Sequence, residues 1–255
     1  MSELGELPGE LVQRLGDVHS VGVITGAGVS VESGIRTYRG QGGLYDDPEE
    51  GERMVEALSS PTLLRDPDRT WRAVSSLARQ VGTARPNVTH HELVRIEQKV
   101  DRFVLLTQNV DRLHHDAGSR NIIDIHGDIF ATRCMSCGLV GRLEAEELQS
   151  LGRAPRCTEC EGTLRPDAVL FGELLPHDKL ARINEEFYEL IPDLVIVAGT
   201  SALFPYITEP VLVARYSDKL TIEINPEPTM LSDRVDFTLR GPASRYLPLI
   251  AAALS

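Results

Sequence analysis

The chain has 255 residues, of which 42% are hydrophobic and 25% charged, a composition typical of an ordinary globular protein. It excludes a disordered, fibrous or low-complexity chain. The 38 acidic residues outnumber the 26 basic ones and give a net charge of -12, which disfavours a nucleic-acid or anionic-membrane partner.

The first seventeen residues, MSELGELPGELVQRLGD, are acidic and amphipathic. They contain no basic stretch followed by an apolar core, so we expect no signal peptide. No apolar run approaches the roughly 18 residues of a membrane span. We therefore expect a cytoplasmic protein without a membrane partner, in a reducing compartment where thiolates are available to bind zinc.

Short apolar runs rich in β-branched residues alternate with helical patterns along the chain. The runs cover residues 21–25, 103–107, 122–125, 194–198 and 220–224. Strands of this kind separated by helices predict an α/β fold with a parallel, Rossmann-like sheet. Ligands of such sheets bind at the carboxyl ends of the strands, so the residues just after each run are the informative ones.

Two stretches do not follow this alternation. Residues 41–89 are polar and helical between prolines, with an acidic run at 46–52 that we interpret as a solvated face. Residues 131–167 hold all four cysteines. We predict that a helical insertion (41–89) and a metal-binding insertion (131–167) form a smaller module. The remaining segments, 1–40, 90–130 and 168–255, would then form the large domain.

A glycine-rich segment follows the first predicted strand. Gly26, Ala27, Gly28 and Ser30 lie there, where glycine lets the backbone approach a pyrophosphate and a following helix N-terminus offers free N–H groups. A plain tight turn is the alternative. The usual GxGxxG spacing is absent because position 31 is Val.

Tyr38 and Arg39 come next, in a glycine-rich stretch that runs to Gly43. Arg39 could pair with a phosphate through two hydrogen bonds, and Tyr38 could cover a ring. Taken by themselves, these residues are more typical of a surface loop.

Polar side chains follow the second and third predicted strands. Gln108, Asn109 and Asp111 suit recognition of an amide or a hydroxyl, although an Asx turn that caps the next helix is the simpler interpretation. His126 is placed for general-base chemistry near pH 7. The other histidines lack this placement, and we interpret them as structural or surface residues: His19, His90, His91, His114, His115 and His177.

The four cysteines form two CxxC pairs, Cys134 with Cys137 and Cys157 with Cys160. Their separation is typical of zinc ribbons, in which four thiolates close the coordination sphere of one structural ion. A redox CxxC is the alternative, but it would need only one pair.

Three further polar or small-residue groups follow apolar runs late in the chain, where an α/β sheet presents ligand contacts. They are Gly199, Thr200 and Ser201, then Asn225, Pro226 and Glu227, and finally Ala243 after Gly241-Pro242.

In this order, the segments GAGVSVESGIRTYR, TQNVDRLH, IHG, two CxxC pairs, RPDAVLFGE, GTS and IN resemble the sirtuin family of NAD-dependent protein lysine deacylases, in its bacterial form. The resemblance covers nearly the whole chain. It implies a Rossmann-like large domain with a small domain made of a zinc ribbon and a helical insertion, and it implies NAD as co-substrate and one structural Zn²⁺.

The resemblance also implies roles for the matching residues. Gly26, Ala27, Gly28, Ser30, Tyr38 and Arg39 would line the NAD site, Gln108, Asn109 and Asp111 would hold nicotinamide and its ribose, and His126 and Asn109 would be catalytic. Gly199, Thr200, Ser201, Asn225, Pro226, Glu227 and Ala243 would face the ADP portion. Val169, Phe171, Gly172 and Glu173 would lie along an acyl-lysine peptide that adds as a strand.

The reaction implied by the resemblance displaces nicotinamide by the acyl-lysine carbonyl oxygen and leaves free lysine and O-acyl-ADP-ribose. Alternatives are a mono-ADP-ribosyltransferase with the same NAD site and a non-catalytic NAD-sensing module; His126 and Asn109 argue against the latter. We expect a monomer.

The chain departs from the family pattern in two places. Members that prefer succinyl- or malonyl-lysine carry a Tyr-x-x-Arg pair where this chain has Val74 and Leu77, so we expect acetyl or longer aliphatic acyl groups; after a shift of register, Arg72 or Arg79 could substitute. Residues 204–208, FPYIT, replace a Pro-Ala-Ala segment beside the peptide groove.

Overall fold

The computed structural model describes residues 7–38, 43 and 46–254. Arg39, which the sequence predicts to pair with a phosphate, lies outside these residues.

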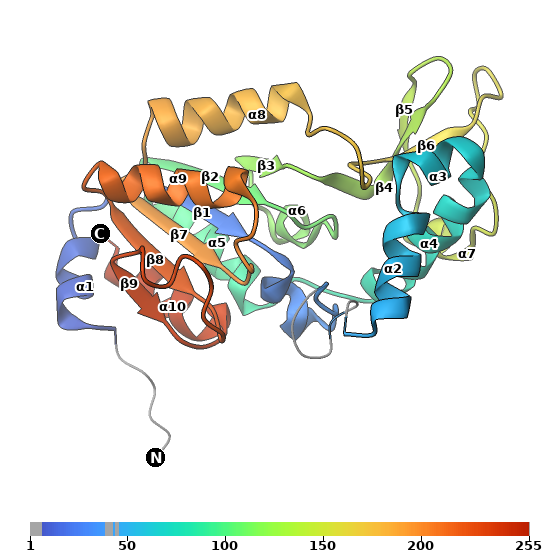
Figure 1. The fold of residues 1–255 in the computed structure, drawn as a ribbon. Coiled ribbons are helices and arrows are strands. Elements are labelled where there is room, and N and C mark those ends of the chain that lie inside the picture. The colour runs from blue at the N-terminus through green and yellow to red at the C-terminus, as the bar shows by residue number, and fades with distance from the viewer. Residues whose placement is uncertain (1–6, 39–42, 44–45, 255) are drawn as a thin grey trace.

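The large part of the molecule is a six-stranded parallel sheet with helices on both faces, which confirms the predicted α/β class (Figure 1). The strand order is β3-β2-β1-β7-β8-β9, and every neighbouring pair is parallel. The strands are β1 (Ser20–Thr25), β2 (Arg102–Thr107), β3 (Ile122–Asp124), β7 (Leu194–Ala198), β8 (Leu220–Ile224) and β9 (Phe237–Leu239). The five predicted strands all form, and the third ends one residue earlier than expected.

The register brings the carboxyl ends of the central strands to one level. Thr25, the last residue of β1, lies opposite Thr107 on β2 and Ala198 on β7. Thr107 in turn lies opposite Asp124, and Ala198 opposite Ile224. The polar residues that follow these strands therefore gather along one edge of the sheet.

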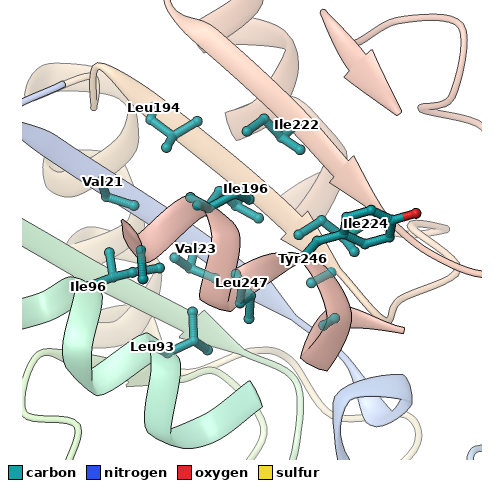
Figure 2. Close-up of a cluster of buried hydrophobic side chains, with 14 of the residues drawn as sticks. Val21, Val23, Leu93, Ile96, Leu194, Ile196, Ile222, Ile224, Tyr246 and Leu247 are labelled. Atoms are coloured by element: carbon teal, nitrogen blue, oxygen red, sulfur yellow. The ribbon is translucent and has the colours of Figure 1, made fainter. Parts of the chain in front are cut away.

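The two faces of the sheet are buried by different helices. Alternate strand side chains point to opposite faces. Val21 and Val23 join one apolar cluster with Leu93, Ile96 and Leu247 (Figure 2). This face is covered by α1 (Gly9–Leu15), α5 (Val88–Lys99) and α10 (Ala243–Ala253).

The opposite face has its own apolar cluster, which includes Ile24, Val104 and Phe187. It is covered by α8 (His177–Ile183), the π-helix η2 (Asn184–Glu189) and α9 (Pro205–Tyr216). Two short elements follow β1 and β2, the 3₁₀ helix η1 (Ala27–Ser33) and α6 (Leu113–Ala117).

A smaller module lies beside this sheet and contains an antiparallel sheet of order β5-β4-β6 (Figure 1). Its elements are α2 (Pro48–Ala57), α3 (Ser60–Arg65), α4 (Pro67–Val81), β4 (Gly127–Cys134), β5 (Val140–Arg142), α7 (Ala145–Ser150) and β6 (Leu164–Ala168). The small sheet extends beyond residues 131–167 on both sides, because β4 begins at Gly127 and β6 ends at Ala168.

The two inserted segments share one apolar core. Trp71 in α4 is fully buried, and its Nε1 donates a hydrogen bond to the Leu164 carbonyl oxygen at 2.7 Å. Ser75 Oγ donates to the Gln149 carbonyl oxygen at 2.7 Å. The amphipathic helix α4 therefore fastens the helical insertion to the cysteine-bearing one. Within the described residues, no helix is both long and apolar enough to cross a bilayer.

Candidate active site

The glycine-rich segment after β1 packs tightly against the loop after β7. Gly26 N donates to the Ala198 carbonyl oxygen at 3.2 Å, and Gly28 N donates to the Gly199 carbonyl oxygen at 2.8 Å. A Cβ at Gly28 would lie 2.7 Å from Gly199 Cα, a distance that real contacts do not show. The N–H groups of these two glycines are therefore paired within the protein. Glycine is needed here because two backbones meet.

The amides of Gln108 and Asn109 join three strand ends. Gln108 Nε2 donates to Thr200 Oγ1 at 2.9 Å, across the end of β1. Asn109 Nδ2 donates to the Gly26 carbonyl oxygen and to Ser30 Oγ, both at 3.2 Å. The predicted cofactor residues of three separate segments thus form one hydrogen-bonded group.

Asp111 is a buried carboxyl group beside this group. Its Oδ2 accepts a hydrogen bond from Ser30 Oγ at 2.7 Å, and its Oδ1 accepts one from Leu113 N at 3.0 Å. Burial raises its pKa, and these two hydrogen bonds act in the opposite direction. The contact to Leu113 is the Asx-type turn considered from the sequence, so Asp111 holds the backbone N–H of the first residue of α6 and also lines the cavity described below.

His126 directly follows β3 and Ile125, and both of its ring nitrogens have partners. Nδ1 lies 2.9 Å from the Gln108 carbonyl oxygen, and Nε2 lies 2.8 Å from the hydroxyl of Tyr206 in α9. Burial lowers its pKa, the backbone contact to Gln108 opposes this effect, and the charge of Lys179 adds to it. The imidazole is therefore neutral at pH 7, as a general base requires.

A cavity lies between the cofactor segment and the small module. Ala27, Tyr38, Asn109 and Asp111 line one side of it, and α4 contributes Leu77. Four residues predicted to bind NAD therefore share a cavity with one predicted to contact the acyl group.

The two aliphatic residues predicted to contact the acyl group are both buried in the apolar core of the small module, and Leu77 also lines the cavity. Val74 is only 1% exposed and packs inside the small module. The neighbouring arginines face away from the cavity, since Arg72 contacts the Gly152 carbonyl oxygen and Arg79 contacts Ser75 Oγ and the Gln149 carbonyl oxygen. Arg36 does line the cavity, and it donates to the Gly43 carbonyl oxygen.

The residues predicted to face the ADP portion of NAD lie after β7, β8 and β9. Gly199 adopts a left-handed conformation with φ of 60°, and Asn225 Nδ2 donates to the Thr200 carbonyl oxygen at 2.7 Å. The side chains of Ser201, Pro226 and Glu227 are exposed. Ala243 is buried in the apolar core at the start of α10, so its side chain is mostly covered from solvent.

The residues predicted to contact the peptide form an extended segment after β6. Val169 N donates to the His126 carbonyl oxygen at 2.9 Å, so this segment runs beside the histidine. Phe171 pairs through its backbone with Leu58 and Ser60, and its side chain is 41% exposed. Gly172 follows with φ of 87°.

Glu173 closes the turn after this segment by a two-bond ion pair. Its oxygens accept from Arg165 Nη1 and Nη2 at 2.7 and 2.8 Å, and one oxygen also accepts from Leu170 N at 3.0 Å. Burial opposes ionisation, but the Arg165 and Leu170 hydrogen bonds prevail and the pKa of Glu173 is lowered. This carboxylate therefore fixes the shape of the segment through Arg165.

A buried pair of histidines lies behind the amides. The rings of His90 and His114 are 4.7 Å apart, and His114 Nε2 lies 3.0 Å from Thr25 Oγ1. Thr25 Oγ1 donates to Thr107 Oγ1, which accepts from Asn109 N at 3.1 Å. Burial lowers the pKa of His90 to about 4 and that of His114 well below its usual range. Both rings are therefore neutral at pH 7.

The four cysteines lie at one end of the small module and are unbridged. The Sγ atoms of Cys134 and Cys160 are 3.5 Å apart, those of Cys137 and Cys157 are 3.7 Å apart, and all four lie within 4.8 Å of one another. Zinc–sulfur bonds of about 2.3 Å in a tetrahedron place sulfurs roughly 3.8 Å apart, so the group fits one ion. The full set of four ligands leaves no open position for water, which makes the site structural.

Sequence reasoning missed Tyr206 as a partner of His126. Residues 204–208, which include it, stand out in the sequence only as a departure from the family pattern, and the contact joins residues 80 positions apart. The threonine and histidine chain behind Asn109 was missed for the same reason. No local pattern signals either contact.

Comparison with known proteins agrees with this geometry. The model of the Sir2 family matches residues 26–204. The chain is 41% identical over 246 residues to the NAD-dependent protein deacylase 2 of Pseudomonas aeruginosa, covering 95% of each chain. It superposes on a Sir2 homolog–NAD complex with a TM-score of 0.85 at 34% identity, covering 98% of this chain and 94% of that one. A Sir2–p53 peptide–NAD⁺ complex gives a TM-score of 0.80 at 25% identity, covering 99% and 98%.

The cysteine geometry predicts one zinc ion per chain. Cys157→Ser should lower the zinc content and loosen the small module, because metal binding is coupled to folding. Elemental analysis and limited proteolysis of the purified variant measure both effects. Ser136→Ala, which changes an exposed side chain between two ligands, should keep the full zinc content. A folded wild-type protein in which elemental analysis finds no zinc would contradict the assignment.

The buried histidine pair predicts loss of stability in acid. The unfolded chain takes up a proton at His90 below about pH 6.5, whereas the folded protein resists it down to about pH 4. By pH 5 this difference removes roughly 2 kcal/mol of unfolding free energy through His90 alone.

Urea unfolding at pH 7.5 and pH 5 measures this loss. His90→Asn, which keeps an acceptor for the Asn87 backbone N–H, should reduce the difference between the two pH values by about that amount. His177→Asn, at a surface position, should leave it as in the wild type. An equal acid sensitivity in the wild type and in His90→Asn would argue against a neutral buried pair.

Proposed function

Because this chain belongs to the Sir2 (sirtuin) family, we propose that it is an NAD-dependent protein lysine deacylase that releases nicotinamide and O-acyl-ADP-ribose. The observation that carries the proposal is the position of His126. A neutral imidazole lies at the end of β3, hydrogen-bonded through Nδ1 to the same residue, Gln108, whose side chain joins the cofactor segments. A candidate general base, His126, and the Gln108 side chain that joins the cofactor segments therefore lie at the same edge of the sheet.

His126 would accept the proton of a ribose hydroxyl at Nε2. Nδ1 faces a carbonyl oxygen, which only accepts hydrogen bonds, so Nδ1 carries the ring proton and Nε2 carries the lone pair. The lowered pKa keeps this lone pair available at neutral pH. NAD supplies the electrophilic ribose carbon and the cationic leaving group.

Asn109 and Asp111 would orient the nicotinamide and its ribose in the cavity beside Ala27 and Tyr38. The Ser30 hydroxyl already bridges the Asn109 amide and the Asp111 carboxylate, which fixes both side chains before a ligand enters. Such preorganisation avoids the loss of side-chain freedom on binding.

The ADP portion would lie along the loops after β7 and β8. Gly199, Thr200 and Ser201 would contact it together with Asn225, Pro226 and Glu227. The hydrogen bond from Asn225 to the Thr200 carbonyl oxygen supports this, because it holds the two loops together. Ala243 would contribute through the start of α10, since its side chain is mostly covered.

The acyl-lysine peptide would add as a strand beside residues 169–173. The backbone link from Val169 to His126 supports this, because it keeps the segment next to the base. Peptides bound in this way are held mainly by backbone hydrogen bonds, so many sequences can be accepted.

We also propose a monomeric cytoplasmic protein. Four free thiols in a zinc-binding arrangement suit a reducing compartment. The acidic net charge argues against a nucleic-acid partner.

The acyl group would be acetyl or a longer aliphatic chain. The face of α4 that borders the cavity presents Leu77, Gln80 and Val81. The arginines of this helix have partners elsewhere: Arg72 and Arg79 contact the carbonyl oxygens of Gly152 and Gln149, and Arg69 pairs with Glu56. A succinyl carboxylate near this face would lack a cationic partner on α4.

The activity is tested by incubating the protein with NAD and an acetyl-lysine peptide and identifying the products. We expect O-acetyl-ADP-ribose and free lysine. His126→Ala should lower turnover by about 10²–10⁴-fold, the usual effect of removing a general base. His177→Ala, a surface histidine on α8, is the matched control and should retain activity. ADP-ribose attached to protein would instead indicate a transferase, and NAD binding without turnover a sensing module.

The acyl preference is tested by kcat/KM for acetyl, butyryl and succinyl forms of one peptide at fixed NAD. Succinyl should be the poorest by on the order of 10²-fold, because α4 offers its buried carboxylate no cationic partner and an uncompensated buried charge costs several kcal/mol. Arg36, which lines the cavity, donates instead to the Gly43 carbonyl oxygen. Preference for the succinyl peptide would contradict the expectation. It would point to Arg36, which lines the cavity, rather than to Arg72 or Arg79.

A further inference from the structure

The lone-pair nitrogen of His126 has a partner within the protein. The Tyr206 hydroxyl lies 2.8 Å from Nε2, and the two rings meet edge to face with centroids 6.0 Å apart. Because Nδ1 donates to the Gln108 carbonyl oxygen, Nε2 is the acceptor and the phenol is the donor. The nitrogen that would receive the substrate proton is thus already hydrogen-bonded in the free protein.

Tyr206 is held in place by its own surroundings. The Phe204 ring stacks on it with centroids 5.4 Å apart and an angle of 12° between the planes. Burial raises the pKa of Tyr206 to about 12, so the hydroxyl keeps its proton throughout the neutral range. It is therefore a stable donor and a poor base.

Hydrogen bonds of Gln108 help to position both His126 and Tyr206. The Gln108 carbonyl oxygen holds His126, and the Gln108 side chain holds Thr200 Oγ1. Thr200 Oγ1 also accepts from Ala202 N at 3.2 Å, in the loop that leads to Tyr206. Gln108 thus links the histidine to the start of the segment that carries the tyrosine.

Few charged groups compete with this contact. Lys179 in α8 faces the histidine, and its ammonium group binds both the backbone oxygen and a carboxylate oxygen of Asp124 at 2.6 and 2.9 Å. Asp124 ends β3, two residues before the histidine. The Lys179–Asp124 pair is common to all the variants discussed below, so it does not obscure the effect of the hydroxyl.

We propose that Tyr206 is a positioning residue for the base, whose hydroxyl occupies Nε2 of His126 in the free protein and yields it to the ribose hydroxyl when the substrates bind. This inference rests on the proposed deacylase function. The hydroxyl keeps the imidazole in one orientation and favours its neutral form, because a donor to Nε2 stabilises the unprotonated nitrogen. On substrate binding, the ribose O–H replaces the phenol O–H at Nε2. The proton of the ribose hydroxyl then passes to Nε2 to give the imidazolium, and its electron pair stays on the ribose oxygen.

The inference predicts different behaviour for the free and the substrate-bound protein. In Tyr206→Phe the free histidine loses a donor to its lone pair, so its pKa should rise by about 0.5 to 1 unit, the size expected for one neutral hydrogen bond. The acidic limb of the kcat/KM profile, which reports the free enzyme, should move to higher pH by the same amount. The acidic limb of the kcat profile should stay, because the ribose has already displaced the phenol.

The experiment combines an NMR titration of the His126 ring protons with pH–rate profiles. The titration uses wild type and Tyr206→Phe without substrates, and the His126 signal is assigned by its loss in His126→Ala. Saturating ADP-ribose should abolish the difference between the two proteins, since it supplies the ribose hydroxyl. The titration needs no turnover, so it still tests the contact if wild type proves inactive as a deacylase; that result would overturn the proposed function instead.

Tyr188→Phe is the matched control. Tyr188 lies in η2, which packs against α9, and its hydroxyl contacts Glu209 of α9 at 3.3 Å. Removing this hydroxyl should leave the His126 titration unchanged. Phe204→Leu, which weakens the stacking without removing the hydroxyl, should shift the titration in the same direction by less and serves if Tyr206→Phe fails to fold.

Two results would overturn the inference. One is an unchanged His126 pKa in Tyr206→Phe. The other is a loss of turnover in that variant as large as the one caused by His126→Ala, with both acidic limbs unmoved. Such a loss would make the phenol part of the proton transfer itself.

Discussion

The parallel strands of the large sheet end at the same level, and the rest of the molecule depends on this constraint. Hydrogen bonding between β1, β2, β3, β7 and β8 fixes their register, so that Thr25, Thr107 and Ala198 lie side by side. Every polar group of the candidate site leaves the sheet within a few residues of this line. Four segments meet there, although most of the chain separates the first from the last: residues 26–30, 108–111, 126 and 199–201.

The crowding that follows from this register explains the glycines. The segment after β1 and the loop after β7 approach so closely that Gly28 and Gly199 meet backbone to backbone. The Gly28 N–H donates to the Gly199 carbonyl oxygen, and this hydrogen bond holds the two loops in a fixed relative position. The shape of the candidate NAD site is thus set by packing between loops, and the polar side chains of Gln108, Asn109 and Asn225 connect the loops.

The β4–β6 part of the small module meets the same edge of the sheet beside His126. β4 begins immediately after His126, and residues 169–171 return beside it, with Val169 bonded to the histidine backbone. The cysteine cluster and the Trp71 core lie within the small module, and they hold the start of β4 and residues 169–171 in place. Zinc would therefore act on the chemistry only through the stability of this module.

The fold class, the strands and the places where chemistry could occur follow from local patterns in the sequence. Apolar β-branched runs, a glycine pair after one of them, His126 after another and two CxxC pairs are local patterns, and each depends on residues close together in the chain. The packing of the folded chain sets which donors and acceptors pair. It assigned the Gly26 and Gly28 N–H groups to the β7 loop, turned Arg72 and Arg79 toward residues 149–152, buried Val74, and brought Tyr206 onto His126. The reason is physical: a hydrogen bond requires a distance of about 3 Å between two atoms, and for residues far apart in the chain only the packed sheet and its helices set that distance.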